Sequence, residues 1–414
     1  MRVLVLNSGS SSIKFLFCDL ADADDGQPIT GGQTHVRGNL KGIGGTATLE
    51  IRINEETETK TSKLVTDHEA AIRWLFESLE WIKTPKGRPF TLSDVGAIGH
   101  RVVHGGDRFS DSVVIDDTVV AEIDALSDLA PLHNPPCLEG IRFAKKIFGA
   151  NFPMVAVFDT AFHQSMPDRA KTYAIPHSLA ARHGIRRYGF HGIAHASLSA
   201  GYATFTGTSL EDTKLITLQL GNGCSVTAIA GGKSVETSMG FTPLEGLVMG
   251  TRSGDLDPAV VSFLAQKEKV EAGEVERWLN EDSGLRGVSG LTNDMRELIL
   301  AATQEGNERA QLAIELFCYR IQKYIGAYLV VLGGVDAIIF GGGIGEASPD
   351  IRARVCEGME WTGLRLDPDR NYACVGLPPG TSSHISQDEA LVKAYVVATD
   401  EETWIAKETV RCLT

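Results

Sequence analysis

Cysteine is scarce in this sequence and follows no paired pattern. The chain has seven cysteines, an odd number, and no two of them form a CxxC pair. A disulfide framework or a zinc site requires regular, paired spacings. We therefore expect reduced thiols that fill small gaps in the core, and a cytoplasmic protein. The seven residues are Cys18, Cys137, Cys224, Cys318, Cys356, Cys374 and Cys412.

Long apolar runs and a basic surplus are missing too. The longest apolar stretch, residues 324–340, is broken by three glycines and Asp336. Because a membrane helix needs about 20 apolar residues, we expect a buried helix and then a buried strand here. The N-terminal apolar run is too short for a signal peptide. The formal charge of −14 argues against nucleic-acid binding, which needs clustered Lys and Arg.

Glycine is abundant, with 44 of 414 residues, which exceeds the usual level of roughly 7%. Several glycines lie in the turns of two predicted hairpins. The first joins residues 3–6 to 13–17, and the second joins 215–220 to 225–230 and leads to a third strand. The second hairpin begins about half a chain length after the first. This repetition predicts two related lobes.

Helices and strands alternate through the rest of the chain, which is typical of an α/β fold. Apolar periodicity predicts helices over residues 68–82, 138–148, 193–204, 259–266, 308–331, 349–359 and 391–405. Short apolar runs predict strands over residues 97–103, 154–158 and 337–340. Residues 22–62 are polar and rich in glycine, and we expect irregular hairpins and surface loops there.

Three glycine clusters directly follow predicted strands, and each is a candidate phosphate cradle. They lie at residues 7–12 (with Lys14 beyond), 221–223 and 341–346. Glycine lets backbone N–H groups approach an anion that a side chain would exclude. Neither GxxxxGK followed by Ser or Thr, nor GxGxxG, nor the protein-kinase motifs occur. The sequence therefore predicts a nucleotide site of another kind.

Histidine and arginine recur where predicted strands end, the edge at which open α/β sheets place ligands. Arg101 and Arg252 stand in separate glycine-rich loops, and a guanidinium binds two oxygens of a carboxylate or phosphate at once. Two such arginines would neutralise two anions brought together. The sequence contains no HExxH motif, which would indicate a zinc site. For Asp255 and Asp257, capping a helix that begins near Pro258 is the favoured interpretation.

Taken together, these segments resemble the acetate kinase family, within the superfamily of actin-like ATPases and sugar kinases. The resemblance covers nearly the whole chain. It is carried by LNSGSSSIKF, GHRVVHGG, LAPLHNPP, VFDTAFH, RRYGFHG, LGNG, GFTPLEGLVMGTRSGDLDP, FGGGIGE and SQDEA.

The resemblance implies an α/β fold of two duplicated actin-like, ribonuclease H-like lobes around a central nucleotide cleft. Residues 1–160 with 392–414 would form one lobe, closed by the C-terminal helix, and residues 161–391 the nucleotide-binding lobe. The implied enzyme is an ATP:acetate phosphotransferase of acetyl-CoA biosynthesis, in which the carboxylate attacks ATP in line to give acetyl phosphate and ADP. It would use Mg²⁺, with Mn²⁺ able to substitute, and form a cytoplasmic homodimer that binds neither nucleic acid nor membrane.

The family's functional positions carry over residue by residue. Catalysis is implied for Arg101, Asp159, His191 and Arg252. The acid would contact Arg101, Val103, Leu132, His133, Phe190 and Pro243. The metal would contact Asn7, Asp159 and Glu389. ATP would contact Asn7, Ser10, Ser12, Lys14, Gln219, Asn222, Gly223, Asp294, Met295, Arg296, Gly343 and Ile344.

Three positions depart from the family pattern. Gln219 stands where the family has His before LGNG, residues 192–195 read GIAH instead of GTSH, and Met295 replaces Phe beside adenine. Gln donates a hydrogen bond but carries no charge, so its effect on phosphate affinity stays open. Two other functions also stay open: a kinase for propionate or butyrate, and a non-catalytic actin-like ATP-binding module.

Overall fold

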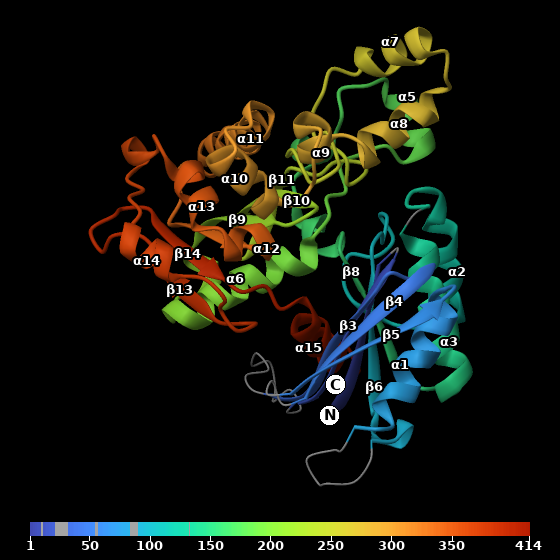
Figure 1. The fold of residues 1–414 in the computed structure, drawn as a ribbon. Coiled ribbons are helices and arrows are strands. Elements are labelled where there is room, and N and C mark those ends of the chain that lie inside the picture. Colours follow the sequence, from blue (N-terminus) through green and yellow to red (C-terminus); the bar gives the residue numbers. More distant parts are fainter. Residues whose placement is uncertain (10, 21–31, 54–56, 83–89, 132) are drawn as a thin grey trace. The chain divides into compact units, whose positions relative to one another are not determined.

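The computed structural model describes all residues except 10, 21–31, 54–56, 83–89 and 132. The chain divides into two compact units, each described here by itself (Figure 1). The first unit combines Met1–Phe162 with Asp400–Thr414, and the second is His163–Thr399.

The first unit contains an eight-stranded sheet in the order β5-β4-β3-β2-β1-β6-β8-β7. The hairpin strands β1 and β2 are antiparallel, whereas β1, β6 and β8 run parallel to one another. The interior of β1, residues 3–6, is fully buried. The strands are β1 (Arg2–Ser8), β2 (Ser12–Leu20), β3 (Gly32–Lys41), β4 (Gly45–Ile53), β5 (Thr57–Val65), β6 (Ala97–Val102), β7 (Val113–Val114) and β8 (Met154–Phe158).

Helices cover both faces of this sheet, as a parallel core requires. Helices α1 (His68–Leu79) and α3 (Asn134–Phe148) pack together on one side, and α2 (Asp117–Ala125) packs on α3 (Figure 1). Helix α15 (Glu401–Leu413) packs along β1 and β6. It approaches so closely that a Cβ on Gly99 would lie 2.8 Å from Cγ2 of Ile405 and would overlap Oγ1 of Thr409.

The second unit contains a six-stranded sheet in the order β11-β10-β9-β12-β14-β13. Helix α6 (Gly192–Thr206) packs on β9, β12 and β14, and helix α11 (Glu308–Leu332) packs on β9 and β10. The strands are β9 (Lys214–Leu220), β10 (Cys224–Ala230), β11 (Lys233–Thr237), β12 (Ala337–Gly341), β13 (Ser382–His384) and β14 (Lys393–Val397). The helices are α4 (Asp168–Lys171), α5 (His177–His183), α6 (Gly192–Thr206), α7 (Ala259–Glu268), α8 (Ala272–Glu281), α9 (Gly284–Ser289), α10 (Met295–Gln304), α11 (Glu308–Leu332), α12 (Gly342–Ala347), α13 (Pro349–Cys356) and α14 (Pro368–Ala373).

The two sheets repeat one topology. In each, three antiparallel strands (β3-β2-β1 and β11-β10-β9) continue into two parallel ones (β6-β8 and β12-β14). Each sheet then ends in a short antiparallel strand, β7 or β13. The two predicted hairpins are both present, so the sequence repetition corresponds to a repeated fold.

Two predicted segments differ from the structure. The single helix expected over residues 391–405 is wrong: Lys393–Val397 is strand β14, and the helix begins only at Glu401, capped by Asp400. The β-branched and aromatic residues Tyr395, Val396 and Val397 favour the strand, where they pack in the sheet core. Within residues 22–62, the described part forms the long regular strands β3, β4 and most of β5 instead of irregular loops.

Strand β14 also changes the position at which the chain returns from the second unit to the first. It belongs to the sheet of the second unit, so only Asp400–Thr414 returns to the first unit, eight residues later than the expected start at 392. Other expected elements agree to within a few residues. Helix α3 begins earlier than expected, at Asn134, because prolines are accepted in the first turn of a helix.

The cysteines lie largely in the core, as the sequence predicts. All seven cysteines are free thiols, and only Cys412 is not fully buried. Among the helices that the structure describes, none combines the length and apolar character needed to cross a membrane.

The close contact between β6 and α15 predicts a stability effect. Gly99→Ala should destabilise the protein by about 1–3 kcal/mol, because its methyl group would overlap Thr409 and Ile405. Gly326→Ala in α11, where a Cβ would meet nothing within 4 Å, is the matched control and should instead stabilise by about 1 kcal/mol. Urea unfolding of both variants measures this, and a Gly99→Ala midpoint at or above wild type would contradict the packing.

Candidate active site

The polar residues predicted for the first unit gather where three parallel strands end. Asn7 lies at the end of β1, Arg101 near the end of β6, and Asp159 directly after β8. The register aligns Leu6 with His100 and Arg101 with Val157. Parallel pairing thus brings together residues that lie up to about 150 positions apart.

Arg101 is the centre of this group. Its Nε donates to Oδ2 of Asp159 over 3.0 Å, its Nη2 donates to the same oxygen, and its Nη1 donates to Oδ1 of Asn7 over 3.3 Å. Nδ2 of Asn7 in turn donates to Oε2 of Glu401 and Oε1 of Glu402, both over 3.0 Å. The predicted residues therefore form one network, which includes two carboxylates that the sequence prediction missed.

Burial and ion pairing shift the pKa values of Asp159 and Arg101 in opposite directions. Burial raises the pKa of Asp159, and the Arg101 charge counteracts it. Burial alone would lower the pKa of Arg101, but the nearby carboxylates of Asp159 and Glu401 outweigh it, and the net shift is upward. Arg101 is therefore a permanent cation held in position by its carboxylate partner.

The turn after β1 is tied by its own hydrogen bonds. The Gly9 N–H donates to the Ser12 carbonyl over 2.8 Å, and Nε2 of His68 donates to the Gly9 carbonyl over 2.7 Å. The Gly9 N–H is thus already used within the turn. Lys14 is the cross-strand partner of Asn7, and its side chain is exposed. Ser10, also predicted here, lies outside the described residues.

A second loop is clamped beside β6. Asn134 accepts from the His104 N–H and donates to the His104 carbonyl, each over 3.0 Å. Val103 is buried, and His133, half-buried, precedes the first residue of α3. Leu132, the remaining predicted residue of this group, lies outside the described residues.

In the second unit, His191 and Arg252 converge on Gly223. A Cβ placed on Gly223 would lie 3.4 Å from Nε2 of His191 and 3.5 Å from Nη1 of Arg252. Both side chains therefore lie within van der Waals reach of residue 223. His191 has a left-handed backbone with φ of 59°, which is uncommon outside glycine and marks a constrained position.

Arg252 carries a half-buried charge and has no carboxylate partner among the described residues. It forms no ion pair with a described residue, and its Nη1 contacts only the Pro243 carbonyl at 3.3 Å and Sδ of Met249 at 3.9 Å. Burial lowers its pKa. Withdrawing a guanidinium partly from water without a carboxylate beside it is costly, and an anion with two oxygens would offset that cost.

The turn at residues 221–223 holds Asn222 firmly. Oδ1 of Asn222 accepts from Nδ2 of Asn293 over 2.8 Å, and its carbonyl accepts from the Gly250 N–H over 2.9 Å. A Cβ on Gly250 would overlap Oδ1 of Asn222, so glycine is needed there. The Gly221 N–H donates to the Gly223 carbonyl over 3.1 Å.

Gln219 faces the third glycine cluster. Its Oε1 accepts from Oγ1 of Thr399 over 3.2 Å, and that hydroxyl accepts from the Gly342 N–H over 3.0 Å. Oε1 of Glu346 accepts from the same Gly342 N–H over 2.9 Å. The Gly342 N–H, like those of Gly9 and Gly221, is therefore committed inside the protein.

The residues expected to hold adenosine have differing exposure. Asp294 caps α10 and is bound by Arg296, whose side chain is 86% exposed. Met295 is buried, 4% exposed, so its side chain belongs to the core. Gly343 is exposed and Ile344 half-buried in the short helix α12.

Oxygen donors suited to a hard cation occur in the first unit. Asp159 accepts from Arg101 only through Oδ2, and Asn7, Glu401 and Glu402 add amide and carboxylate oxygens nearby. Glu389, also expected to contact the metal, is exposed in the second unit, in the turn before β14. No cluster of three or more His, Cys, Asp or Glu poised to hold a metal occurs in the described part of the chain.

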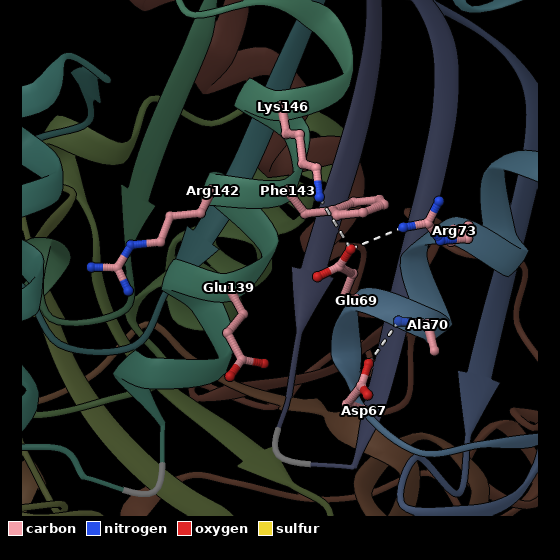
Figure 2. Close-up of a pocket in the computed structure, with 8 residues that line it drawn as sticks. All are labelled: Asp67, Glu69, Ala70, Arg73, Glu139, Arg142, Phe143 and Lys146. Atoms are coloured by element: carbon pink, nitrogen blue, oxygen red, sulfur yellow. Dashed lines mark hydrogen bonds and ion pairs between the residues drawn. The ribbon is translucent and has the colours of Figure 1, made fainter.

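The pocket between α1 and α3 is a separate feature (Figure 2). Figure 2 shows Glu69 directed at Arg73 and Lys146, with which it forms ion pairs of 2.9 and 3.5 Å. Its lining also includes Asp67, Glu139, Arg142 and Phe143, and none of the predicted site residues. Charges of both signs neutralise each other in this pocket.

Asp255 and Asp257 have different roles. Asp257 accepts from the N–H of Ala259 at the start of α7, as the capping interpretation expects. Asp255 does not cap this helix: it accepts from the Gly246 N–H over 2.8 Å and from the Tyr324 hydroxyl over 2.8 Å.

Two sheets of one repeated topology, shared with solved acetate kinases, define an α/β protein of the actin-like ATPase class. Within this class the chain belongs to the Acetokinase family, whose model matches residues 2–407. Proteins of this family use ATP and a divalent metal ion.

Individual relatives match over their full lengths. The chain is 49% identical to the acetate kinase of Solibacter usitatus (100% of this chain, 98% of the relative) and 46% identical to that of Chloroherpeton thalassium (100% and 99%). Among solved structures, Porphyromonas gingivalis acetate kinase has a TM-score of 0.87 at 38% identity, covering 100% of both chains. A Francisella tularensis propionate kinase has a TM-score of 0.85 at 38% identity, covering 98% of both.

Buried neutral histidines predict the pH dependence of stability. Burial lowers the pKa of His100 to about 3, and its Nε2 has no hydrogen-bond partner among the described residues. Since the unfolded chain binds this proton near pH 6.5, stability is full above that pH and falls towards pH 3. His100→Leu should flatten the slope between pH 4 and 6 by about 1.4 kcal/mol per pH unit.

Urea unfolding at a series of pH values measures this slope. The wild type and His100→Leu should show parallel profiles above pH 7, which serves as the internal control. An unchanged slope between pH 4 and 6 would mean that His100 is already protonated in the folded protein.

Proposed function

We propose that this chain is an acetate kinase that transfers the γ-phosphoryl group of ATP reversibly to acetate, giving acetyl phosphate and ADP. Family membership over the whole chain supports the reaction class. The observation that carries the site assignment is the half-buried Arg252, without an ion-pair partner among the described residues, beside His191 at Gly223. It is an arrangement ready for an anion.

The chemistry of the reaction fits these side chains. A carboxylate is already ionised at pH 7, so no general base is needed to make the nucleophile. The obstacle is the approach of two anions and the charge that develops on the phosphoryl oxygens. In the proposed mechanism Arg101 and Arg252 hold the acetate and the phosphoryl group, His191 donates a hydrogen bond to the phosphoryl oxygens, and His133 assists.

Asn7, Asp159 and Glu389 are proposed to hold Mg²⁺, for which Mn²⁺ could substitute. When bound, the ion would neutralise charge on the ATP phosphates. The oxygen ligands at Asn7 and Asp159 support this choice. The structure adds Glu401 and Glu402, which orient the Asn7 amide and so direct its oxygen towards Arg101.

The remaining assignments concern ATP. Ser12, Lys14, Gln219, Asn222 and Gly223 are proposed to contact the phosphates, with Ser10 as a further candidate. Asp294, Arg296, Gly343 and Ile344 are proposed to contact the adenosine. The buried Met295 supports the adenine site from the core rather than by an exposed contact. Gln219 acts through its amide group, since its Oε1 already accepts from Thr399.

Val103, Phe190 and Pro243, with Leu132, are proposed to form the small apolar pocket for the methyl group of acetate. Val103 and Phe190 are buried, which supports this role. The similarity to a propionate kinase keeps a longer acid as the second candidate. One methylene changes the binding free energy by only about 1–3 kcal/mol. The preference between acetate and a longer acid therefore has to be measured.

We also propose a cytoplasmic homodimer. The free thiols support a reducing compartment. Exposed apolar side chains on α11, among them Val330 at 82% and Val331 at 53% exposure, support an interface between copies.

An acyl-hydroxamate assay with ATP and Mg²⁺ tests the function. We expect turnover with acetate to exceed that with propionate, and that with propionate to exceed that with butyrate. A preference for propionate would replace acetate as the substrate. Folded protein that is inactive with all three acids would indicate a non-catalytic ATP-binding module instead.

Arg252→Ala should lower kcat by at least about a hundredfold, because charge stabilisation of the transferring group is lost. The fold should stay intact, since no carboxylate loses its partner. Arg277→Ala removes the same charge from exposed ion pairs on α8 and should leave kcat unchanged. Arg101→Ala should be as damaging, but it also leaves Asp159 buried without its cation. Near-normal turnover of Arg252→Ala would contradict the site assignment.

A further inference from the structure

His191 is held from two sides. On the backbone side, the buried His163 donates from Nε2 to the Phe190 carbonyl over 2.9 Å, directly before the left-handed residue. Since a carbonyl only accepts, Nδ1 of His163 accepts from the Ser234 hydroxyl over 2.9 Å. Burial lowers the pKa of His163 to about 4, so this clamp is neutral. It fixes the direction in which the His191 side chain leaves the backbone.

On the side-chain side, three buried residues form a relay behind the imidazole. Nδ1 of His191 lies 2.9 Å from Oγ of Ser225, which lies 2.7 Å from Nε2 of His195. Nδ1 of His195 lies 2.7 Å from Oγ1 of Thr217. Ser225, His195 and Thr217 are fully buried and come from β10, α6 and β9. Residues of three elements of the second unit thus form one chain that ends at Nδ1 of His191.

The relay has a preferred direction because each hydroxyl has one proton. The other acceptor near the Thr217 hydroxyl is the Thr227 carbonyl at 3.5 Å, a distance at which a hydrogen bond is weak. The Thr217 proton therefore goes to Nδ1 of His195, so His195 carries its own proton on Nε2 and donates it to Ser225. Burial, together with the nearby His163 and His191, lowers the pKa of His195 well below its usual value, so its ring is neutral.

We propose that Ser225, His195 and Thr217 are positioning residues that keep the proton of His191 on Nε2. Ser225, which accepts from His195, then donates its own proton to Nδ1 of His191. Nε2 is the nitrogen that faces Gly223 beside Arg252. A neutral imidazole with its proton there donates to a phosphoryl oxygen, whereas the other tautomer turns a lone pair towards an anion.

The inference rests on the proposed function for its kinetic consequence only. The tautomer itself is visible without turnover, in the ¹⁵N spectrum of the full-length protein labelled at histidine, with the His191 signals assigned by comparison with His191→Asn. In the wild type, Nδ1 of His191 should have the shift of an unprotonated nitrogen and Nε2 that of a protonated one. Ser225→Ala should move both towards the averaged shifts of a mixture.

The kinetic effect should fall on kcat. Ser225→Ala should lower kcat by about tenfold, the effect of losing roughly one hydrogen bond from the transition state, while KM for ATP and the acid stays near wild type. Ser199→Ala is the matched control, since this buried serine of α6 donates only to the Ala196 carbonyl. It should change neither kcat nor the His191 spectrum.

A second pair of variants separates the hydroxyl from packing. Thr217→Val keeps the shape but removes the hydroxyl, and Thr217→Ser keeps the hydroxyl but removes a methyl group. The relay predicts altered His191 shifts and a lower kcat in Thr217→Val, and wild-type behaviour in Thr217→Ser. If Ser225→Ala fails to fold, these two Thr217 variants still test whether the relay sets the tautomer of His191.

Several results would overturn the proposal. Wild-type protein with the His191 proton on Nδ1 would do so at once. Unchanged shifts in both Ser225→Ala and Thr217→Val would do the same, and so would equal losses of kcat in Thr217→Val and Thr217→Ser. If the wild type proves inactive with every acid, the proposed function fails, and the spectra alone still decide the tautomer.

Discussion

Parallel pairing of a hairpin strand with a strand far along the chain is the constraint on which both units depend. Strand β1 pairs with β6, and β9 pairs with β12. Parallel neighbours end at the same edge, so the residues that follow them meet there. This places Asn7, Arg101 and Asp159 in one network and Gln219 beside the turn at Gly342. Both sheets then need helices on both faces, which the intervening segments supply.

The two arginines proposed for catalysis, Arg101 and Arg252, are held by different means. Arg101 is fixed by carboxylates and keeps its charge through them. Arg252 is surrounded by neutral groups, and its charge is compensated by no described residue. Around His191 the neighbouring histidines are buried and neutral, so they orient the ring without adding charge. In the described part of the second unit, the guanidinium of Arg252 therefore lies beside Gly223 among neutral groups.

Local patterns predicted most of the fold. The hairpins, the strand at residues 154–158 and the helix beginning at His68 follow from apolar periodicity and turn residues. The prediction failed at residues 391–405, where strand β14 and helix α15 are separated by only three residues, Ala398–Asp400. A periodicity window spans such a short junction and merges both elements. It also failed within 22–62, where polar residues and glycines conceal the alternation by which β4 buries Ala47, Leu49 and Ile51 on one face.

The sequence by itself determined the residue types of the site, the repetition of the fold and the family, because motifs and turns are local properties of the chain. Tertiary structure alone decided which groups touch. Glu401 and Glu402 reach Asn7 from almost 400 residues away, and Ser225 of β10 joins His191 to His195 at the start of α6. Spacing along the chain carries no information about such contacts. They arise only when the core packs, because burial forces each polar group to find a partner in space.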